Sequence, residues 1–85
     1  MRIRLTSLAA RDLESVEEFT SQDNPRAAIK VVIRILDAIE TLREFPNVGR
    51  PGRMPGTREL VVGGTPFIAI YKVRENVIHG ARRWP

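Results

Sequence analysis

One segment, residues 25–44, restricts the folds open to this chain more than any other. Its apolar side chains recur at spacings of three and four, the period of an α-helix, and cover much of its circumference: Ala28, Ile29, Val32, Ile33, Ile35, Leu36, Ile39 and Leu42. Asn24 is a good helix N-cap, Pro25 fits the first helical position, and Phe45-Pro46 ends the segment. Because one neighbour cannot cover so wide a face, we expect this helix between another helix and a β-sheet.

A strand and a second helix are predicted before it. Ile3 and Leu5 alternate with arginines, which is typical of a short, half-buried strand, and Thr6 or Ser7 is suited to cap a following helix. Apolar residues then recur with helical spacing, at Ala9, Leu13, Val16 and Phe19 or Thr20. Because only a short link separates the two helices, they should form an antiparallel hairpin.

The rest of the chain has the pattern of loops and strands. Residues 46–56 contain three Gly and three Pro, which predicts a loop from which Arg50 and Arg53 project. Residues 57–62 read as a strand. Residues 67–73 read as a second strand, a central one because both of its faces are apolar.

The chain ends with a tight turn at 74–76, a third strand that begins at 77–79, and a terminal segment, 80–85. The order of elements predicts an α+β fold, with an N-terminal helical hairpin packed on one face of a small antiparallel β-sheet. A chain of 85 residues is long enough for one domain, so we expect a single domain over residues 1–85.

Positive charge is concentrated near the C-terminus. Residues 50–85 carry seven basic and two acidic residues, and twelve of the fourteen cations in the chain are Arg. Because the planar guanidinium group suits carboxylate and phosphate, this region is predicted to contact an anionic partner, with an ordinary solvated surface as the alternative.

Composition also excludes several classes of protein. The chain has no Cys, which excludes disulfides, Cys-based zinc sites and a thiol nucleophile. Neither a signal peptide nor an apolar run of about 20 residues is visible. We therefore expect a cytoplasmic protein with no cofactor, no metal ion and no membrane contact.

Taken together and in order, six segments spread over nearly the whole chain resemble the ParE/RelE toxin family of type II toxin–antitoxin systems, and its ParE-like branch more than its RelE-like branch. Each segment is weak evidence alone, but each also fits the structural position expected for it. The segments are Arg11-Asp12-Leu13-Glu14, Asp23 to Ala28, Phe45 to Arg53, Pro55 to Leu60, Gly64-Thr65-Pro66-Phe67 with Tyr71-Lys72-Val73, and His79 to Pro85.

The resemblance implies a function. Members of this family are bacterial plasmid-stabilisation or stress toxins, and a toxin of the ParE type inhibits DNA gyrase rather than catalysing a reaction. A cognate ParD-type antitoxin forms a hetero-oligomer with such a toxin and neutralises it. The pair contacts operator DNA only through the antitoxin.

The chain departs from the family pattern at one place. Between Tyr71-Lys72-Val73 and His79-Gly80, about half a dozen residues fewer are present than in the family, which at ~3.3 Å per residue is most of a strand. We therefore expect a shortened last strand or a different register. A detoxified remnant that only binds antitoxin is the hypothesis that follows from this departure.

The cationic and apolar residues give the candidate binding sites. Target binding is predicted for six residues of the C-terminal half: Arg50, Arg53, Arg58, Arg82, Arg83 and Trp84. Antitoxin binding is predicted for Ile29 and Val31, at the edges of the apolar stripe, and for Arg58. For the end of the chain, a solvated tail is the alternative.

A ribosome-dependent ribonuclease of the RelE type is the second reading, with Arg58 and His79 as the candidate catalytic residues. The alternatives are an ion pair of Arg58 with Glu59 or a helix acid, and a packing role for His79. Tyr71 should face the core, and few Lys or acidic groups are left to act as base and acid. A general nucleic-acid-binding module is a further reading, which would need stacking aromatics.

Overall fold

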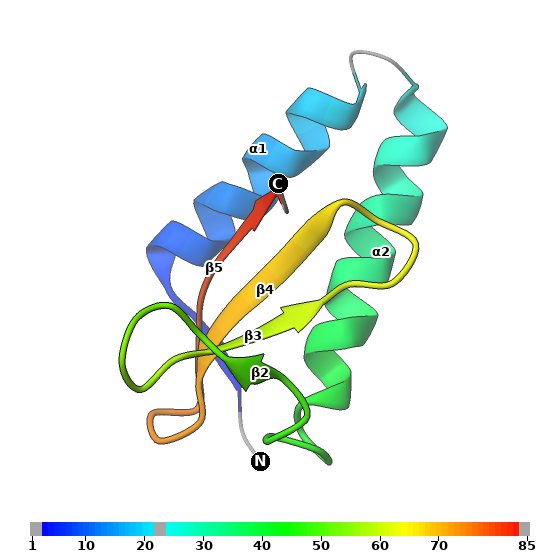
Figure 1. The fold of residues 1–85 in the computed structure, drawn as a ribbon. Coiled ribbons are helices and arrows are strands. Elements are labelled where there is room, and N and C mark those ends of the chain that lie inside the picture. Colours follow the sequence, from blue (N-terminus) through cyan, green and yellow to red (C-terminus); the bar gives the residue numbers. More distant parts are fainter. Residues whose placement is uncertain (1–2, 22–23, 84–85) are drawn as a thin grey trace.

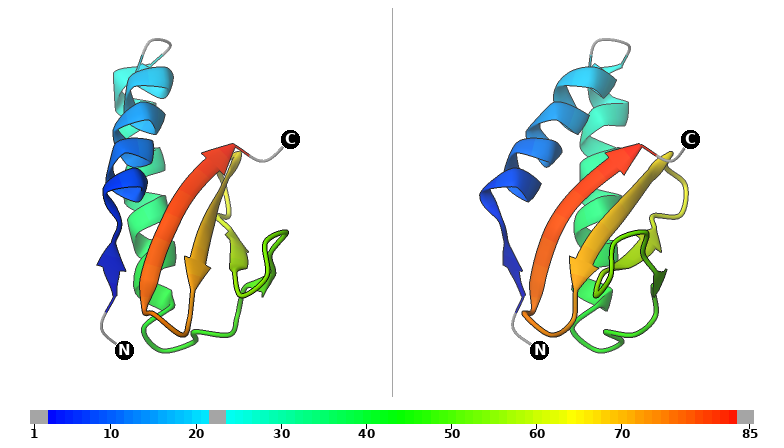
Figure 2. Two further views of the ribbon diagram at one scale, coloured as in Figure 1. Left: turned by 90° about the vertical axis from the view of Figure 1, so that its left-hand side faces the viewer. Right: turned by 60° about the vertical axis from the view of Figure 1, so that its left-hand side comes forward.

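Two antiparallel helices cover one face of a five-stranded sheet (Figures 1 and 2). The computed structural model describes residues 3–21 and 24–83. This architecture confirms the α+β fold with a helical hairpin on a sheet. The elements in chain order are β1 (Arg4–Leu5), α1 (Ser7–Ser21), α2 (Pro25–Thr41), β2 (Arg50–Pro51), β3 (Arg58–Val61), β4 (Phe67–Lys72) and β5 (Val77–Arg83).

The sheet is mixed. Its strand order is β1-β5-β4-β3-β2, and neighbouring strands are antiparallel except for β1 and β5, which run parallel. The expected antiparallel meander is thus correct for β2 to β5. The first strand is the exception because the helical hairpin returns the chain to the sheet before the meander starts, and a parallel neighbour needs such a long connection.

Both helices start at the predicted caps. The Thr6 hydroxyl accepts a hydrogen bond from the Ala9 N–H at 3.0 Å. The Asn24 side-chain oxygen accepts from the N–H groups of Arg26 and Ala27, with Pro25 in the first turn. Helix α2 ends slightly earlier than predicted, because turns follow Thr41 before Pro46.

The core lies between the helices and the sheet. Ile35 of α2 and Leu42, the residue that caps its C-terminus, are fully buried with Tyr71 and Ile78 from the sheet. In contrast, three residues that widen the apolar stripe of α2 point to solvent, with exposed fractions of 45–59%: Ile29, Ile33 and Leu36. The expectation that α1 and the sheet cover the whole apolar face of α2 is therefore wrong for this side.

Strand β5 is not cut short. It has seven residues and pairs with β4 along its length, from Val77 opposite Lys72 to Arg83 opposite Phe67. The pairing contains one β-bulge, because Ile78 and Gly80 face the consecutive residues Tyr71 and Ile70 and leave His79 without an opposite residue. The expected shortening of the last strand is therefore wrong, the pairing register shifts at the bulge, and the segment 80–83 is a strand rather than a solvated tail.

The long loop predicted at 46–56 contains the two-residue strand β2, which pairs with the start of β3. The sequence did not predict this strand because proline is unusual in strands. Pro51 is tolerated here because β2 lies at the edge of the sheet. None of the described helices is both long and apolar enough to cross a membrane.

Candidate functional site

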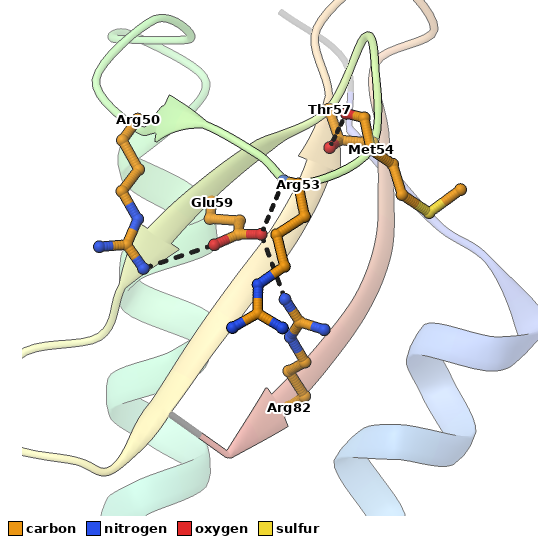
Figure 3. A network of polar contacts seen from close by, with 6 residues as sticks. All are labelled: Arg50, Arg53, Met54, Thr57, Glu59 and Arg82. Atoms are coloured by element: carbon orange, nitrogen blue, oxygen red, sulfur yellow. Dashed lines mark hydrogen bonds and ion pairs between the residues drawn. The ribbon is translucent and has the colours of Figure 1, made fainter. Parts of the chain in front are cut away.

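Arginines from different parts of the chain converge on the sheet face opposite the helices (Figure 3). Strand pairing brings them together: Arg50 of β2 lies opposite Glu59 of β3, and Arg82 of β5 lies opposite Ile68 of β4. Glu59 points to this open face because side chains alternate along a strand and its neighbour Leu60 packs against the core.

Glu59 is the centre of this group, which we call the Glu59 clasp: Glu59, Arg50, Arg53 and Arg82. One carboxylate oxygen of Glu59 accepts from Arg50 Nη2 at 3.4 Å. The other accepts from Arg82 Nη2 at 3.3 Å and from the backbone N–H of Arg53 at 3.3 Å. The clasp therefore ties β2, the following loop, β3 and β5 to a single side chain.

The Glu59 carboxylate is ionised at neutral pH even though it is buried. Burial acts to raise its pKa, but the Arg53 N–H and the charges of Arg82 and Arg50 together outweigh burial. The pKa of Glu59 is therefore lowered from its usual value. Two guanidinium groups, those of Arg50 and Arg82, pair with this one carboxylate, and Arg53 contacts it through its backbone N–H.

A shallow hollow of about 370 Å³ adjoins the clasp and is lined by Arg50, Pro51, Gly52, Arg53 and Glu59. Gly52 is needed at its wall, since a Cβ at this position would overlap the Thr57 side chain. The Thr57 hydroxyl in turn donates to the Met54 carbonyl, which closes the loop that carries Arg53 (Figure 3).

Tyr71 and Arg58 hold the preceding segment, 46–49, from the other face of the sheet. The Tyr71 hydroxyl donates to the Pro46 carbonyl at 2.8 Å and accepts from the Gly49 N–H at 2.9 Å. Arg58 Nη1 donates to the carbonyls of Asn47 and Gly49, at 3.3 and 2.6 Å. Tyr71 is buried in the core as predicted.

The predicted target-binding residues separate into groups. Arg50, Arg53 and Arg82 come together in the clasp. Arg58 does not join them, because consecutive residues of a strand point to opposite faces. For the same reason, the alternative reading of Arg58, an ion pair with Glu59, is not found among the described residues. Arg83 ends β5, but its side chain, like the whole of Trp84, lies outside the described part of the chain.

The two candidate catalytic residues are on separate strands. Arg58 is on β3 and is used to hold the 46–49 segment, whereas His79 is at the bulge of β5, on the far side of β4. The His79 backbone carbonyl accepts from the Thr6 hydroxyl at 3.1 Å. No group of three metal-ligating side chains occurs within residues 3–21 and 24–83.

A second candidate surface is the exposed side of α2, which we call the α2 stripe: Ile29, Ile33 and Leu36. These positions are four and three residues apart, so they lie on one side of the helix. Of the predicted antitoxin-binding residues, Ile29 belongs to the stripe. Val31 is only partly exposed and packs against the core, and Arg58 lies on the sheet.

Sequence reasoning missed Glu59 as a site residue and missed Ile33 and Leu36 as surface residues. The available signal for Glu59 was its place in a strand between Arg58 and the apolar Leu60 and Val61, where an acid needs a partner. For the α2 stripe, the signal was an apolar face wider than a sheet and one helix can cover.

A helical hairpin on one face of a mixed sheet, with arginines grouped on the open face, defines a small two-layer α+β protein with a basic surface. Residues 3–84 match the family described as the ParE toxin of the type II toxin–antitoxin system parDE. The chain belongs to this ParE toxin family.

Comparisons with individual proteins agree with this assignment. The chain is 40% identical over 89 residues to "Putative toxin Y4kP" of Sinorhizobium fredii, covering 99% of this chain and 93% of the relative. It is 32% identical over 74 residues to "Toxin RelE2" of Caulobacter vibrioides, covering 87% and 82%. A solved structure described as the chromosomal ParDE TA system from P. aeruginosa is similar with a TM-score of 0.87, at 28% identity, covering all of this chain and 97% of that one.

Proposed function

We propose that this chain is the toxin of a bacterial type II toxin–antitoxin pair, inhibits DNA gyrase without catalysing a reaction, and is neutralised in the cytoplasm by a ParD-type antitoxin. The observation that carries the proposal is the match to the ParE family over residues 3–84. The similarity to a ParDE system over the full chain supports the antitoxin partner. Operator DNA is contacted only through the antitoxin.

The α2 stripe is the proposed centre of the antitoxin-binding surface. Ile29, Ile33 and Leu36 expose apolar area that neither α1 nor the sheet covers. An amphipathic partner helix buries such a row of side chains at helical spacing. Val31 and Arg58, which the sequence also suggests as antitoxin contacts, lie outside the row, so their contribution to antitoxin affinity should be smaller than that of Ile29.

The open sheet face is the proposed target-binding surface. Arg50, Arg53 and Arg82 are grouped there. Arg83 and Trp84, the next residues of the chain after Arg82, extend the same proposal to the C-terminus. The α2 stripe and the open sheet face lie on opposite sides of the sheet. The antitoxin and the target would therefore bind different side chains.

A ribonuclease of the RelE type is the alternative, and the arrangement of the side chains argues against it. A general acid or base and a transition-state stabiliser must lie within hydrogen-bond reach of the same substrate. Arg58 instead holds backbone carbonyls of the 46–49 segment, and His79 is on a strand beyond β4. The hypothesis of a detoxified remnant rested on a shortened last strand, but β5 has seven residues.

The test is gyrase supercoiling by purified toxin, with codon-linked mRNA cleavage on ribosomes measured in parallel. We expect loss of supercoiling or accumulation of cleaved DNA, with both effects removed by antitoxin. mRNA cleavage that an Arg58→Ala, His79→Ala double variant abolishes, with gyrase unaffected, would replace the proposal by the ribonuclease.

A further inference from the structure

The Glu59 clasp gathers three arginine residues around one buried carboxylate. Arg50 and Arg82 each give an N–H to Glu59, and Arg53 gives only its backbone N–H. A guanidinium group has five N–H donors, so one bond to Glu59 leaves Arg82 with donors to offer to a second anion. The Arg50 and Arg82 side chains are 45% and 42% exposed, so a partner can reach both.

Glu59 itself is too buried to contact a partner, since only 5% of its side chain is exposed. Both of its oxygens are used inside the clasp. Its role toward a partner is therefore indirect: it fixes the direction of Arg50 and Arg82 and the backbone of Arg53. An arginine that is already ordered loses less conformational entropy when it binds an anion.

The surroundings of the clasp favour a protein partner over a nucleic acid. Met54, beside Arg53, is 64% exposed, and Val61, on the same face as Glu59, is 51% exposed. Nucleic-acid strands are held by basic grooves with exposed aromatic rings for stacking. Among the described residues, Phe67 and Tyr71 of the sheet are buried in the core, and the exposed Phe45 follows α2 at the start of the long loop.

The geometry points to the Glu59 clasp as the docking site for an acidic segment, with aliphatic residues beside its carboxylates, of the protein that this toxin inhibits. Arg50, Arg53 and Arg82 bind the carboxylates, and Met54 and Val61 contact the aliphatic side chains. Glu59 is a positioning residue. The inference rests on the proposed function, because it specifies the chemistry by which the toxin recognises its target.

The first experiment measures binding of purified toxin to a fluorescein-labelled peptide that alternates Glu with Leu. Arg53→Gln should weaken binding about tenfold, the loss expected for one charge-assisted contact. The matched control is Arg11→Gln, which removes the same charge from an exposed position on α1 and should change affinity less than about twofold. Equal losses of peptide affinity in the two variants would overturn the docking site, because the net charge of the protein alone would then explain the binding.

Glu59→Gln gives a test in which the two explanations differ in sign. The substitution raises the net charge by one, so attraction by charge alone predicts tighter peptide binding. Loss of the ordered arginines predicts weaker binding, which is our expectation for protein shown to be folded by circular dichroism. Tighter binding would overturn the positioning role. If this variant does not fold, Arg82→Gln and Arg50→Gln take its place against the same Arg11→Gln control.

A third arm replaces the peptide by single-stranded oligothymidylate of equal formal charge. Binding of the oligonucleotide that is lost in Arg53→Gln, with no such loss for the peptide, would overturn the inference in favour of a nucleic-acid surface. These outcomes differ from failure of the proposed function, which would appear as no inhibition of gyrase by the unaltered toxin whatever the peptide does.

Discussion

At the scale of single residues, buried polar groups with several partners connect the loop and the sheet. Glu59 binds three arginine residues, and Tyr71 holds both ends of the 46–49 segment. Such groups are costly to leave unpaired, so each should be visible in the stability of the protein. Because neither side chain is exposed to a partner, substitutions of Glu59 and Tyr71 should change the stability of the protein without removing a direct contact to a partner.

Glu59→Gln should lower the free energy of unfolding at neutral pH by about 1–2 kcal/mol, a modest value because Arg50 and Arg82 are partly exposed to water. The folded state lowers the pKa of Glu59 below the ordinary 4.5, so ionised Glu59 stabilises the protein above that pH. This contribution is lost as the pH falls through the lowered pKa. Urea unfolding of the unaltered protein and of Glu59→Gln should show that the difference between their free energies of unfolding becomes smaller in acid. A difference that becomes larger in acid would contradict the stabilising role of ionised Glu59.

Tyr71→Phe removes the hydroxyl that accepts from Gly49 and donates to Pro46. We expect a loss of about 1–3 kcal/mol in the free energy of unfolding, because the Gly49 N–H stays buried without this acceptor. Amide hydrogen exchange should become faster at Gly49 and not at Ile35 in the α2 core. Unchanged protection at Gly49 would show that the 46–49 segment does not depend on Tyr71.

At the scale of elements, the helices and strands β3 and β4 were predictable, whereas β2 and the second half of β5 were not. Periodicity and capping residues are local, so Thr6, Asn24 and Pro25 were enough to locate the starts of α1 and α2. The second half of β5 has no alternating apolar pattern. It is a strand because β4 pairs with it and because Asp12 of α1, far away in the sequence, accepts from the Ala81 N–H at 3.1 Å.

Ile33→Glu in the α2 stripe should lower the affinity for a ParD-type antitoxin at least about thirtyfold, or about 2 kcal/mol, because it places a charge in the centre of an apolar interface. Folding should be unchanged, since Ile33 is 51% exposed. Ser15→Glu, an exposed position on α1, is the matched control. Isothermal titration that finds equal affinity for Ile33→Glu and Ser15→Glu would remove the stripe from the antitoxin interface.

At the scale of the whole molecule, the two candidate surfaces lie on different sides of the sheet. The fold class followed from the order of the elements, and the arginine-rich C-terminal half indicated an anionic partner. The grouping of Arg50, Arg53 and Arg82 around Glu59 could not be predicted, because it depends on the register of β2, β3, β4 and β5 together. A one-residue shift would turn Glu59 to the core.

We propose that the chain is a toxin that a ParD-type antitoxin neutralises. Growth of a bacterial host should therefore be measured after this chain is induced, alone and together with the antitoxin encoded beside it. We predict growth arrest by the chain alone and recovery when the antitoxin is present. Normal growth in cells that contain folded chain, or arrest that the antitoxin does not relieve, would contradict the account.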